Sequence, residues 1–157
     1  MKYIVTGLLR SRTAWTSVFL GCTAHPFNRM TPENTMDIDC FADPAFLLFW
    51  EELYDGRKIV VIKRDYDEAL QSAVKVFGMD VNKVMPKMKR NMDKMLSSID
   101  CYVVDFDNYD GEALWKHLYP DEEFSSYRYE RLSELTIQER KDAYIAPEAI
   151  AAIRGVI

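Results

Sequence analysis

Residues 57–72 read RKIVVIKRDYDEALQS and give the clearest indication of the fold class. Its core, KIVVIK at 58–63, is rich in β-branched residues and is the clearest strand in the chain. Asp65 and Glu68 then form a pair of the capping-box type, and apolar residues follow at helical spacing as far as Phe77. The stretch therefore predicts a buried strand that leads directly into a helix.

The same order of strand and helix recurs on both sides of this stretch. Residues 2–6 form a short apolar run that ends at Gly7, and a helical pattern begins at Thr13. Residues 102–106 (YVVDF) predict another strand, followed by a helix near Leu114. Strands that alternate with helices favour parallel pairing, because right-handed crossovers cover both faces of the sheet. We expect an α/β fold with three layers, α/β/α, around a short and mainly parallel sheet, in one domain that spans 1–157.

The sequence signals are weaker in residues 22–54, between the strands predicted at 2–6 and 58–63. Residues 22–36 look irregular, and 37–41 (DIDCF) predict a further short strand. Asp43 followed by Pro44 is typical of a helix start, which predicts a helix over 45–54.

A methionine-rich segment and the tail supply the remaining predicted helices. Residues 81–98 place their methionines on one helical face, which serves either as core or as an interface, and Pro86 should divide or kink this helix. A last helix is expected after Pro147, around Ile150 and Ile153.

The composition of the chain argues against nucleic-acid and membrane partners. The chain has 157 residues, 48% of them hydrophobic, and a net charge of −5, which suits a globular core and disfavours duplex nucleic acid. No apolar run is long enough for a membrane helix, and the amino-terminal residues do not resemble a signal peptide. The three cysteines, at 22, 40 and 101, fit free thiols in a reducing compartment. We therefore expect a cytoplasmic protein with no nucleic-acid or membrane partner, and the sequence leaves its oligomeric state open.

In parallel folds, ligands bind beyond the carboxyl ends of the strands, which here means residues 7–13, 63–72 and 105–110. The first of these lies within TGLLRSRTAW (6–15), where backbone N–H groups at a helix start make an anion cradle to which Arg10 and Arg12 add charge. It is not a Walker A loop, because Thr13 and Ala14 stand where that motif needs its lysine and its magnesium-binding hydroxyl.

Two segments together resemble the PAPS-dependent sulfotransferase family. The family's P-[KR]-S-G-T-[ST]-W motif reads LRSRTAW here, at residues 9–15, with departures at Leu9, Arg12 and Ala14. The family's R-[DN]-P-x-D-x-[AV]-x-S motif reads RDYDEALQS, at residues 64–72, with Tyr66 in place of the proline. The spacing of eight between Arg64 and Ser72 agrees with the second motif, as do Asp67 and Ala69. The resemblance extends over most of the chain, and it is strongest in residues 3–19 and 57–77.

The resemblance implies a P-loop-NTPase-like sulfotransferase core of minimal size, of the kind encoded by some bacteria and phages, that moves a sulfuryl group from PAPS to a hydroxyl or amine of a small acceptor. It implies PAPS or PAP as the cofactor and no metal. Arg10 would neutralise the bridging oxygen as it leaves, while Arg64 and Ser72 would hold the 3′-phosphate. The implied cofactor-binding residues are Arg10, Ser11, Arg12, Thr13, Ala14, Trp15, Arg64 and Ser72.

Some positions depart from the family pattern. Leu9 replaces a proline, and Arg12 replaces a glycine, which costs about 1 kcal/mol if the backbone there needs a positive φ. The family's late phosphate-binding loop has no clear match, and its candidate substitutes are Lys87, Lys89 and Arg90.

An acceptor hydroxyl or amine also needs a general base. His25 is the preferred candidate, with Glu33, Asp37 and Asp39 as the carboxylate candidates, while the chain's second histidine, His117, fits a structural role. Two further functions stay open. One is a catalytically inactive module that binds PAP-like nucleotides, and the second is a P-loop-type nucleotide kinase.

Overall fold

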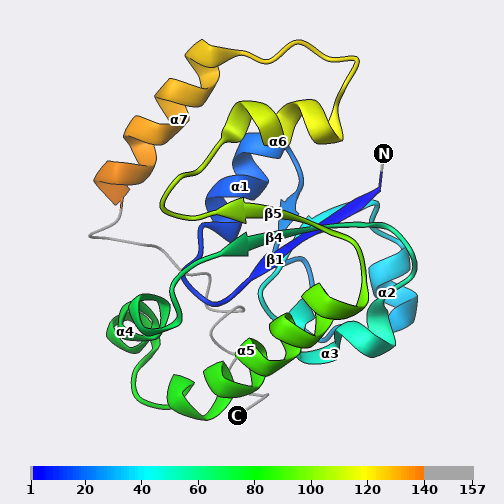
Figure 1. Cartoon of the computed structure of the whole chain (residues 1–157), viewed down its shortest axis with the longest axis vertical. Helices are drawn as coiled ribbons and strands as arrows, with labels where there is room; N and C mark the ends of the chain where they lie inside the picture. The colour runs from blue at the N-terminus through cyan, green and yellow to red at the C-terminus, as the bar shows by residue number, and fades with distance from the viewer. Residues whose placement is uncertain (1, 140–157) are drawn as a thin grey trace.

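The computed structural model describes residues 2–139 and contains a five-stranded sheet in which every neighbouring pair of strands is parallel. The order across the sheet is β2-β3-β1-β4-β5, which places β1 at the centre (Figure 1). The expected α/β fold with a parallel sheet is confirmed. The strands are β1 (Tyr3–Gly7), β2 (Thr23–Ala24), β3 (Cys40–Ala42), β4 (Lys58–Lys63) and β5 (Cys101–Asp105).

The central strands are buried on both faces, so their sequences are continuously apolar rather than alternating. Ile59 and Val61 of β4 belong to one core cluster, and Val60 and Ile62 belong to the other. This alternation follows from the two-residue period of a strand, and it gives the sheet a separate core on each side.

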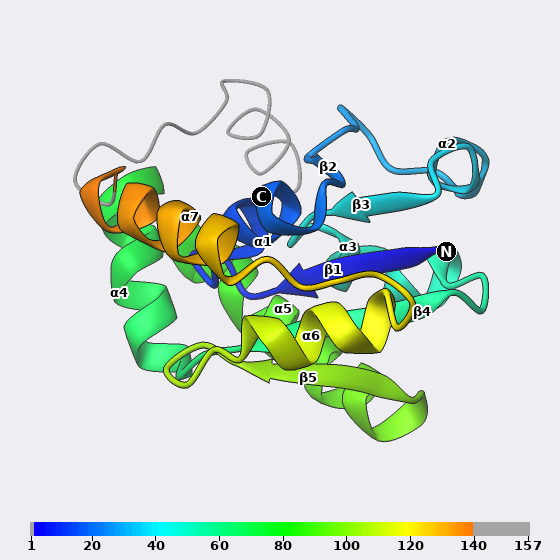
Figure 2. The ribbon, with the colours of Figure 1, turned by 90° about the horizontal axis from the view of Figure 1, so that it is seen from above.

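Helices cover both faces, as Figures 1 and 2 show. One layer contains α3 (Phe46–Leu53), α4 (Tyr66–Phe77) and α5 (Val81–Ser98), and the short α2 (Pro32–Met36) contacts α3. The other layer contains α1 (Thr13–Leu20) and α6 (Gly111–Leu118), and α7 (Ser126–Glu139) packs against α1. The three layers that the sequence predicts are therefore present.

Local sequence signals account for several helix starts. Asp65 Oδ1 accepts from the Glu68 N–H and caps α4, as predicted, and Asp110 caps α6 in the same way through the Ala113 N–H. The apolar face of α5 is core: Val81, Val84, Met85, Met88, Met92 and Met95 are all at most 4% exposed.

Some expectations differ from the structure. The segment 22–36 contains β2 and α2, and the strand expected at 37–41 begins only at Cys40. The helix α5 runs through Pro86 without being divided, and α7 had no predicted counterpart. The helix expected around Ile150 and Ile153 lies outside the described residues.

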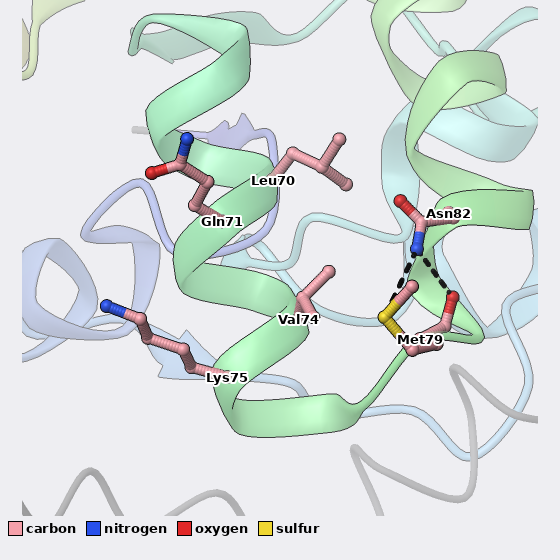
Figure 3. A pocket seen from close by; sticks show the side chains of 6 residues that line it. All are labelled: Leu70, Gln71, Val74, Lys75, Met79 and Asn82. Atoms are coloured by element: carbon pink, nitrogen blue, oxygen red, sulfur yellow. Dashed lines mark hydrogen bonds between the residues drawn. The ribbon is translucent and has the colours of Figure 1, made fainter.

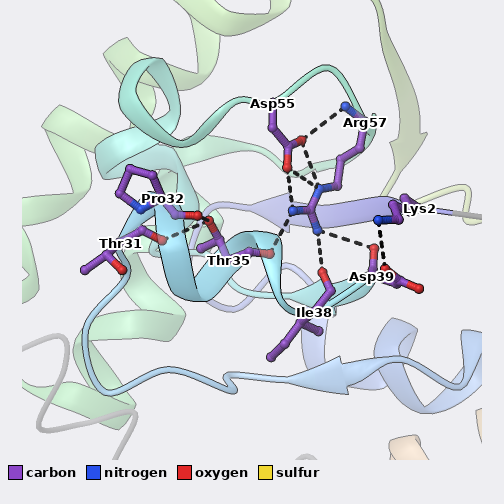
Figure 4. Close-up of polar contacts among 8 residues, drawn as sticks. All are labelled: Lys2, Thr31, Pro32, Thr35, Ile38, Asp39, Asp55 and Arg57. Carbon is purple, nitrogen blue, oxygen red and sulfur yellow. Dashed lines mark hydrogen bonds and ion pairs between the residues drawn. The ribbon is translucent and has the colours of Figure 1, made fainter.

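The amino-terminal edge of the sheet is held by Arg57, whose side chain is 5% exposed (Figure 4). Its guanidinium donates to the backbone oxygens of Thr35 and Ile38, at 2.7 and 2.6 Å. The Asp55 carboxylate accepts from Arg57 Nη2 at 2.6 Å and from Nε at 3.0 Å. These bonds join the start of β4 to α2 and to the segment before β3, which satisfies a buried charge at the edge opposite to the carboxyl ends of the strands.

No helix within residues 2–139 is long and apolar enough to cross a lipid bilayer.

Candidate functional site

The polar residues predicted from the first motif follow β1, beside a strand whose following helix lies on the opposite face of the sheet. The chain leaves β1 for α1 on one face, and it leaves β4, the neighbouring strand, for α4 on the other face. A crevice outside the carboxyl ends of two such strands is where open α/β sheets bind ligands. The segments after β1 and β4 are therefore the structural counterpart of the predicted site.

The segment between β1 and α1 has an unusual backbone. Arg10 and Arg12 both adopt left-handed conformations, with φ of 66° and 65°. Arg12 is the residue before the helix, and it supplies no side-chain cap, unlike Asp65 and Asp110 at the starts of α4 and α6. The side chain of Arg12 therefore does not cap the first-turn N–H groups of α1. N–H groups that lack a side-chain cap at a helix start are able to bind an anion.

Arg10, Arg64 and Ser72 come together in this crevice. Arg10 Nε donates to Ser72 Oγ at 3.1 Å, and Arg64 Nη1 donates to the backbone oxygen of Arg10 at 2.6 Å. The side chains of all three residues are half-buried. The two motifs, far apart in sequence, therefore form one cationic cluster with a hydroxyl in it.

Aromatic rings from the segment after β5 support the arginines. The Arg64 guanidinium carbon lies 4.1 Å from the centre of the Phe106 ring. Arg12 lies 5.3 to 5.6 Å from the rings of Trp15, Phe106 and Tyr109. A cation over an aromatic face is attracted by the ring quadrupole, so these rings hold the guanidinium groups in place. All three segments predicted beyond the strand ends, 7–13, 63–72 and 105–110, meet here.

The remaining residues of the first motif have distinct positions. Ser11 is fully buried, and its Oγ has no hydrogen-bond partner within the part of the chain that the structure describes. Thr13 is 5% exposed and Ala14 is exposed. Trp15 Nε1 donates to the backbone oxygen of Leu132 in α7, so its ring packs as core and contributes to the site through Arg12.

His25 lies at the same edge of the sheet, directly after β2. Its Nδ1 is 3.3 Å from Oδ1 of Asp43, which follows β3. The Asp43 side chain is 8% exposed and the His25 side chain 29%. His25 also has a positive φ, of 48°. Three non-glycine residues within 2–139 have a positive φ, and all three are predicted site residues: Arg10, Arg12 and His25. Such backbone is concentrated at functional sites in proteins.

Several predicted residues lie away from this crevice. Asp39 precedes β3 and pairs with Lys2 at 3.2 Å, at the amino-terminal edge of the sheet. Lys89 pairs with Asp93 along α5 at 2.7 Å, so the structure gives it a local partner. His117 stacks on Tyr102 with ring centres 4.2 Å apart. Burial and the nearby charge of Lys58 lower the pKa of His117.

The remaining carboxylate candidates for the general base, Glu33 and Asp37, belong to α2. Glu33 lies in its first turn, and Asp37 follows its last residue directly. The remaining basic candidates for a late phosphate-binding loop, Lys87 and Arg90, are exposed on α5, which packs against α3 and α4.

The candidate site also contains three residues that were not predicted from the sequence, Asp43, Phe106 and Tyr109. The sequence around Asp43 indicates a helix start, and its Oδ1 does accept from the Ala45 N–H at 2.9 Å, although α3 begins only at Phe46. The signal for Phe106 and Tyr109 is their place in 105–110, the segment after a strand end, combined with their aromatic character.

A separate pocket of about 460 Å³ lies between α4 and the start of α5 (Figure 3). The side chains of Leu70 and Val74 point across it toward Asn82 in α5. The residues that line it are Leu70, Gln71, Val74, Lys75, Met79 and Asn82. Ser72 and the three arginines do not line this pocket, which is therefore distinct from the crevice at the strand ends.

Comparisons with known proteins leave the family open. No protein-family model matches the chain, and no curated protein or solved structure matches it significantly.

Proposed function

We propose that the chain is a sulfotransferase that binds PAPS in the crevice between the ends of β1 and β4. The observation that carries the proposal is the joining of Arg10, Arg64 and Ser72 by hydrogen bonds across 62 and 54 residues of sequence. Guanidinium groups and a hydroxyl around a helix start suit an anionic ligand with more than one phosphate group. The matching sulfotransferase motifs supply the choice of PAPS among such ligands.

The charges suggest how the donor lies. Arg64 and Ser72 bind the 3′-phosphate, and the N–H groups at the start of α1 bind the 5′-phosphate. The acceptor oxygen or nitrogen forms a bond to sulfur while the bond from sulfur to the 5′-phosphate oxygen breaks, and that oxygen keeps the electron pair. Arg10 neutralises the negative charge that develops there, and His25 takes the acceptor proton. Catalysis then rests on positioning and on electrostatic stabilisation.

The contact between Arg10 and Ser72 places a requirement on this scheme. Both residues are assigned to the ligand, but to different ends of it. Arg10 must therefore exchange the Ser72 hydroxyl for the leaving oxygen when PAPS enters. This exchange costs little, because a hydrogen bond that is replaced by another is nearly neutral in net energy.

Calorimetric titration with PAP tests the proposal. We expect Arg64→Ala to abolish tight PAP binding, because a charge-assisted contact to phosphate is lost. Lys63→Ala is the matched control, since it removes the same charge from an exposed neighbouring position that is assigned no ligand role. Absence of PAP binding to the unaltered chain would overturn the proposal.

Turnover separates the proposed enzyme from an inactive binding module and from a kinase. PAPS should be converted to PAP in the presence of phenol or amine acceptors, and the rate should survive a chelator. PAP binding without turnover would indicate the inactive binding module. Preference for ATP–Mg²⁺ over PAP, with activity that collapses on chelation, would indicate the kinase.

A further inference from the structure

The pair formed by His25 and Asp43 is built on the sheet rather than on a loose loop. The His25 N–H donates to the backbone oxygen of Ala42, and the Asp43 N–H donates to that of Val5, both at 2.9 Å. Thr6 Oγ1 donates to the backbone oxygen of Asp43 at 2.9 Å. The pair is thus tied to β1 just before the anion-binding segment begins.

The two side chains differ in environment. The carboxylate of Asp43 is nearly buried and points its Oδ1 at both the Ala45 N–H and His25 Nδ1. The imidazole ring remains partly exposed. A carboxylate that lies this close to Nδ1 favours the neutral tautomer with its proton on Nδ1, in which the other nitrogen, Nε2, is basic.

We propose that Asp43 is the positioning residue for His25: it holds the proton on Nδ1 so that Nε2 can accept the proton of the acceptor. The catalytic part of this inference rests on the proposed function, whereas the pairing and the tautomer do not. In the transfer step, the proton moves from the acceptor to Nε2 as the new bond to sulfur forms. Asp43 remains ionised and stabilises the resulting imidazolium.

Nuclear magnetic resonance tests the tautomer directly, because the chain contains only two histidines, His25 and His117. Long-range ¹H–¹⁵N spectra of the neutral rings distinguish a protonated Nδ1 from a protonated Nε2, and His117→Gln assigns the two sets of signals. We expect His25 to carry its proton on Nδ1. A wild-type His25 that is protonated on Nε2 would overturn the proposal.

Asp43→Ser is the sharpest variant. Serine can still accept from the Ala45 N–H, as it does in short turns, but its side chain is too short to reach His25. We expect the fold to be kept and the preference for Nδ1–H to be lost. Asp43→Asn, which keeps an acceptor oxygen and removes the charge, should retain the tautomer. An unchanged tautomer in Asp43→Ser would contradict the pairing.

Kinetics with PAPS and a phenol acceptor then test the catalytic part. We expect Asp43→Ser to lower kcat about 100-fold, to leave PAP affinity within about twofold of wild type, and to add no further loss to that of His25→Ala. A parallel fall in PAP affinity would show a structural role and overturn the inference. If the wild-type chain does not bind PAP, the proposed function fails and the catalytic part of this inference fails with it. The spectra still decide whether Asp43 pairs with His25 and sets its tautomer.

Discussion

Arg10 and Ser72 are 62 residues apart in the chain, yet Arg10 Nε lies 3.1 Å from Ser72 Oγ. The contact joins the segment after β1, which leads into α1 on one face of the sheet, to α4 on the other face. Arg64, at the end of β4, reinforces it by donating to the backbone oxygen of Arg10 at 2.6 Å. The two motifs that suggested one ligand thus meet through their own side chains.

We expect Ser72→Ala to weaken PAP binding about 10-fold. The change removes the hydroxyl that the proposed function assigns to the 3′-phosphate, and a hydrogen bond to a charged group contributes about 1.5–3 kcal/mol. Calorimetric titration measures the loss. Ser97→Ala is the control, because Ser97 donates to the backbone oxygen of Lys94 on the exposed side of α5. Equal affinities of Ser72→Ala and wild type would remove Ser72 from the site.

The left-handed backbone at Arg12 predicts an unusual order of stability. Because φ is 65° there, we expect Arg12→Gly to be about 1 kcal/mol more stable to urea than Arg12→Ala, since alanine keeps the strain and glycine relieves it. Both variants lose the same guanidinium contacts with Trp15 and Tyr109.

The matched control for this comparison is Ala14→Gly, at an exposed position inside α1. There glycine should be less stable than alanine by about 0.5–1 kcal/mol, the ordinary order in a helix. If both positions favour alanine, the backbone strain assigned to Arg12 is absent in solution.

The close pairing of β1 with β4 predicts that Gly7 tolerates no side chain. A Cβ at this position would lie 2.7 Å from the backbone oxygen of Ile62, with which Gly7 is in register. We expect Gly7→Ala to lower the free energy of unfolding by about 1–3 kcal/mol, as for overpacking in a core. Gly56→Ala is the comparison. Its Cβ would meet nothing within 4 Å, so its cost is the strain of a φ of 90° alone, about 1 kcal/mol. A Gly7→Ala variant as stable as wild type would contradict the close approach.

The place of the candidate site could be inferred from the sequence, because it depends only on where the strands lie and where they end. The pattern KIVVIK identifies β4, and the geometry of parallel sheets then directs attention to the residues that follow each strand. The motif spacing also predicts that Arg64 and Ser72 serve one site. The structure adds the contacts through Arg10 that join them.

Other features depend on distant contacts that no local pattern reveals. The strand β2 is two residues long, and among the described strands it pairs with β3 alone. A strand this short is too brief to show an alternation of apolar and polar residues in segment 22–36. The pairing of His25 with Asp43 arises because β2 and β3 are neighbours in the sheet, whereas the sequence around Asp43 indicates a helix cap. Pro86 lies within the second turn of α5, and the methionines on either side of it are buried in the core. Their packing stabilises a helix that a proline at this position disfavours locally.

The ion pair at the amino-terminal edge predicts a pH-dependent stability. Hydrogen bonds from Arg57 hold the pKa of Asp55 below its ordinary value. A carboxyl whose pKa is lower in the folded state stabilises the fold above its unfolded-state pKa, and this contribution is lost as the pH falls through the folded-state pKa. We expect Asp55→Asn to lower the free energy of unfolding by about 1–3 kcal/mol at neutral pH, since a charged partner of the buried Arg57 is lost.

Urea titrations of wild type and Asp55→Asn at a series of pH values measure this contribution. The difference between the two proteins should be constant from neutral pH down to about 4, the ordinary pKa of an aspartate. It should shrink below that pH, because Asp55 takes up a proton more readily in the unfolded wild-type chain than in the folded protein. Asp39→Asn is the control, since the side chains of Asp39 and its partner Lys2 are 68% and 64% exposed and an exposed pair contributes little. A difference that persists unchanged in strong acid would mean that the asparagine acts through packing rather than through charge, and that the Arg57 guanidinium is held by the backbone oxygens of α2 and of the segment before β3 alone.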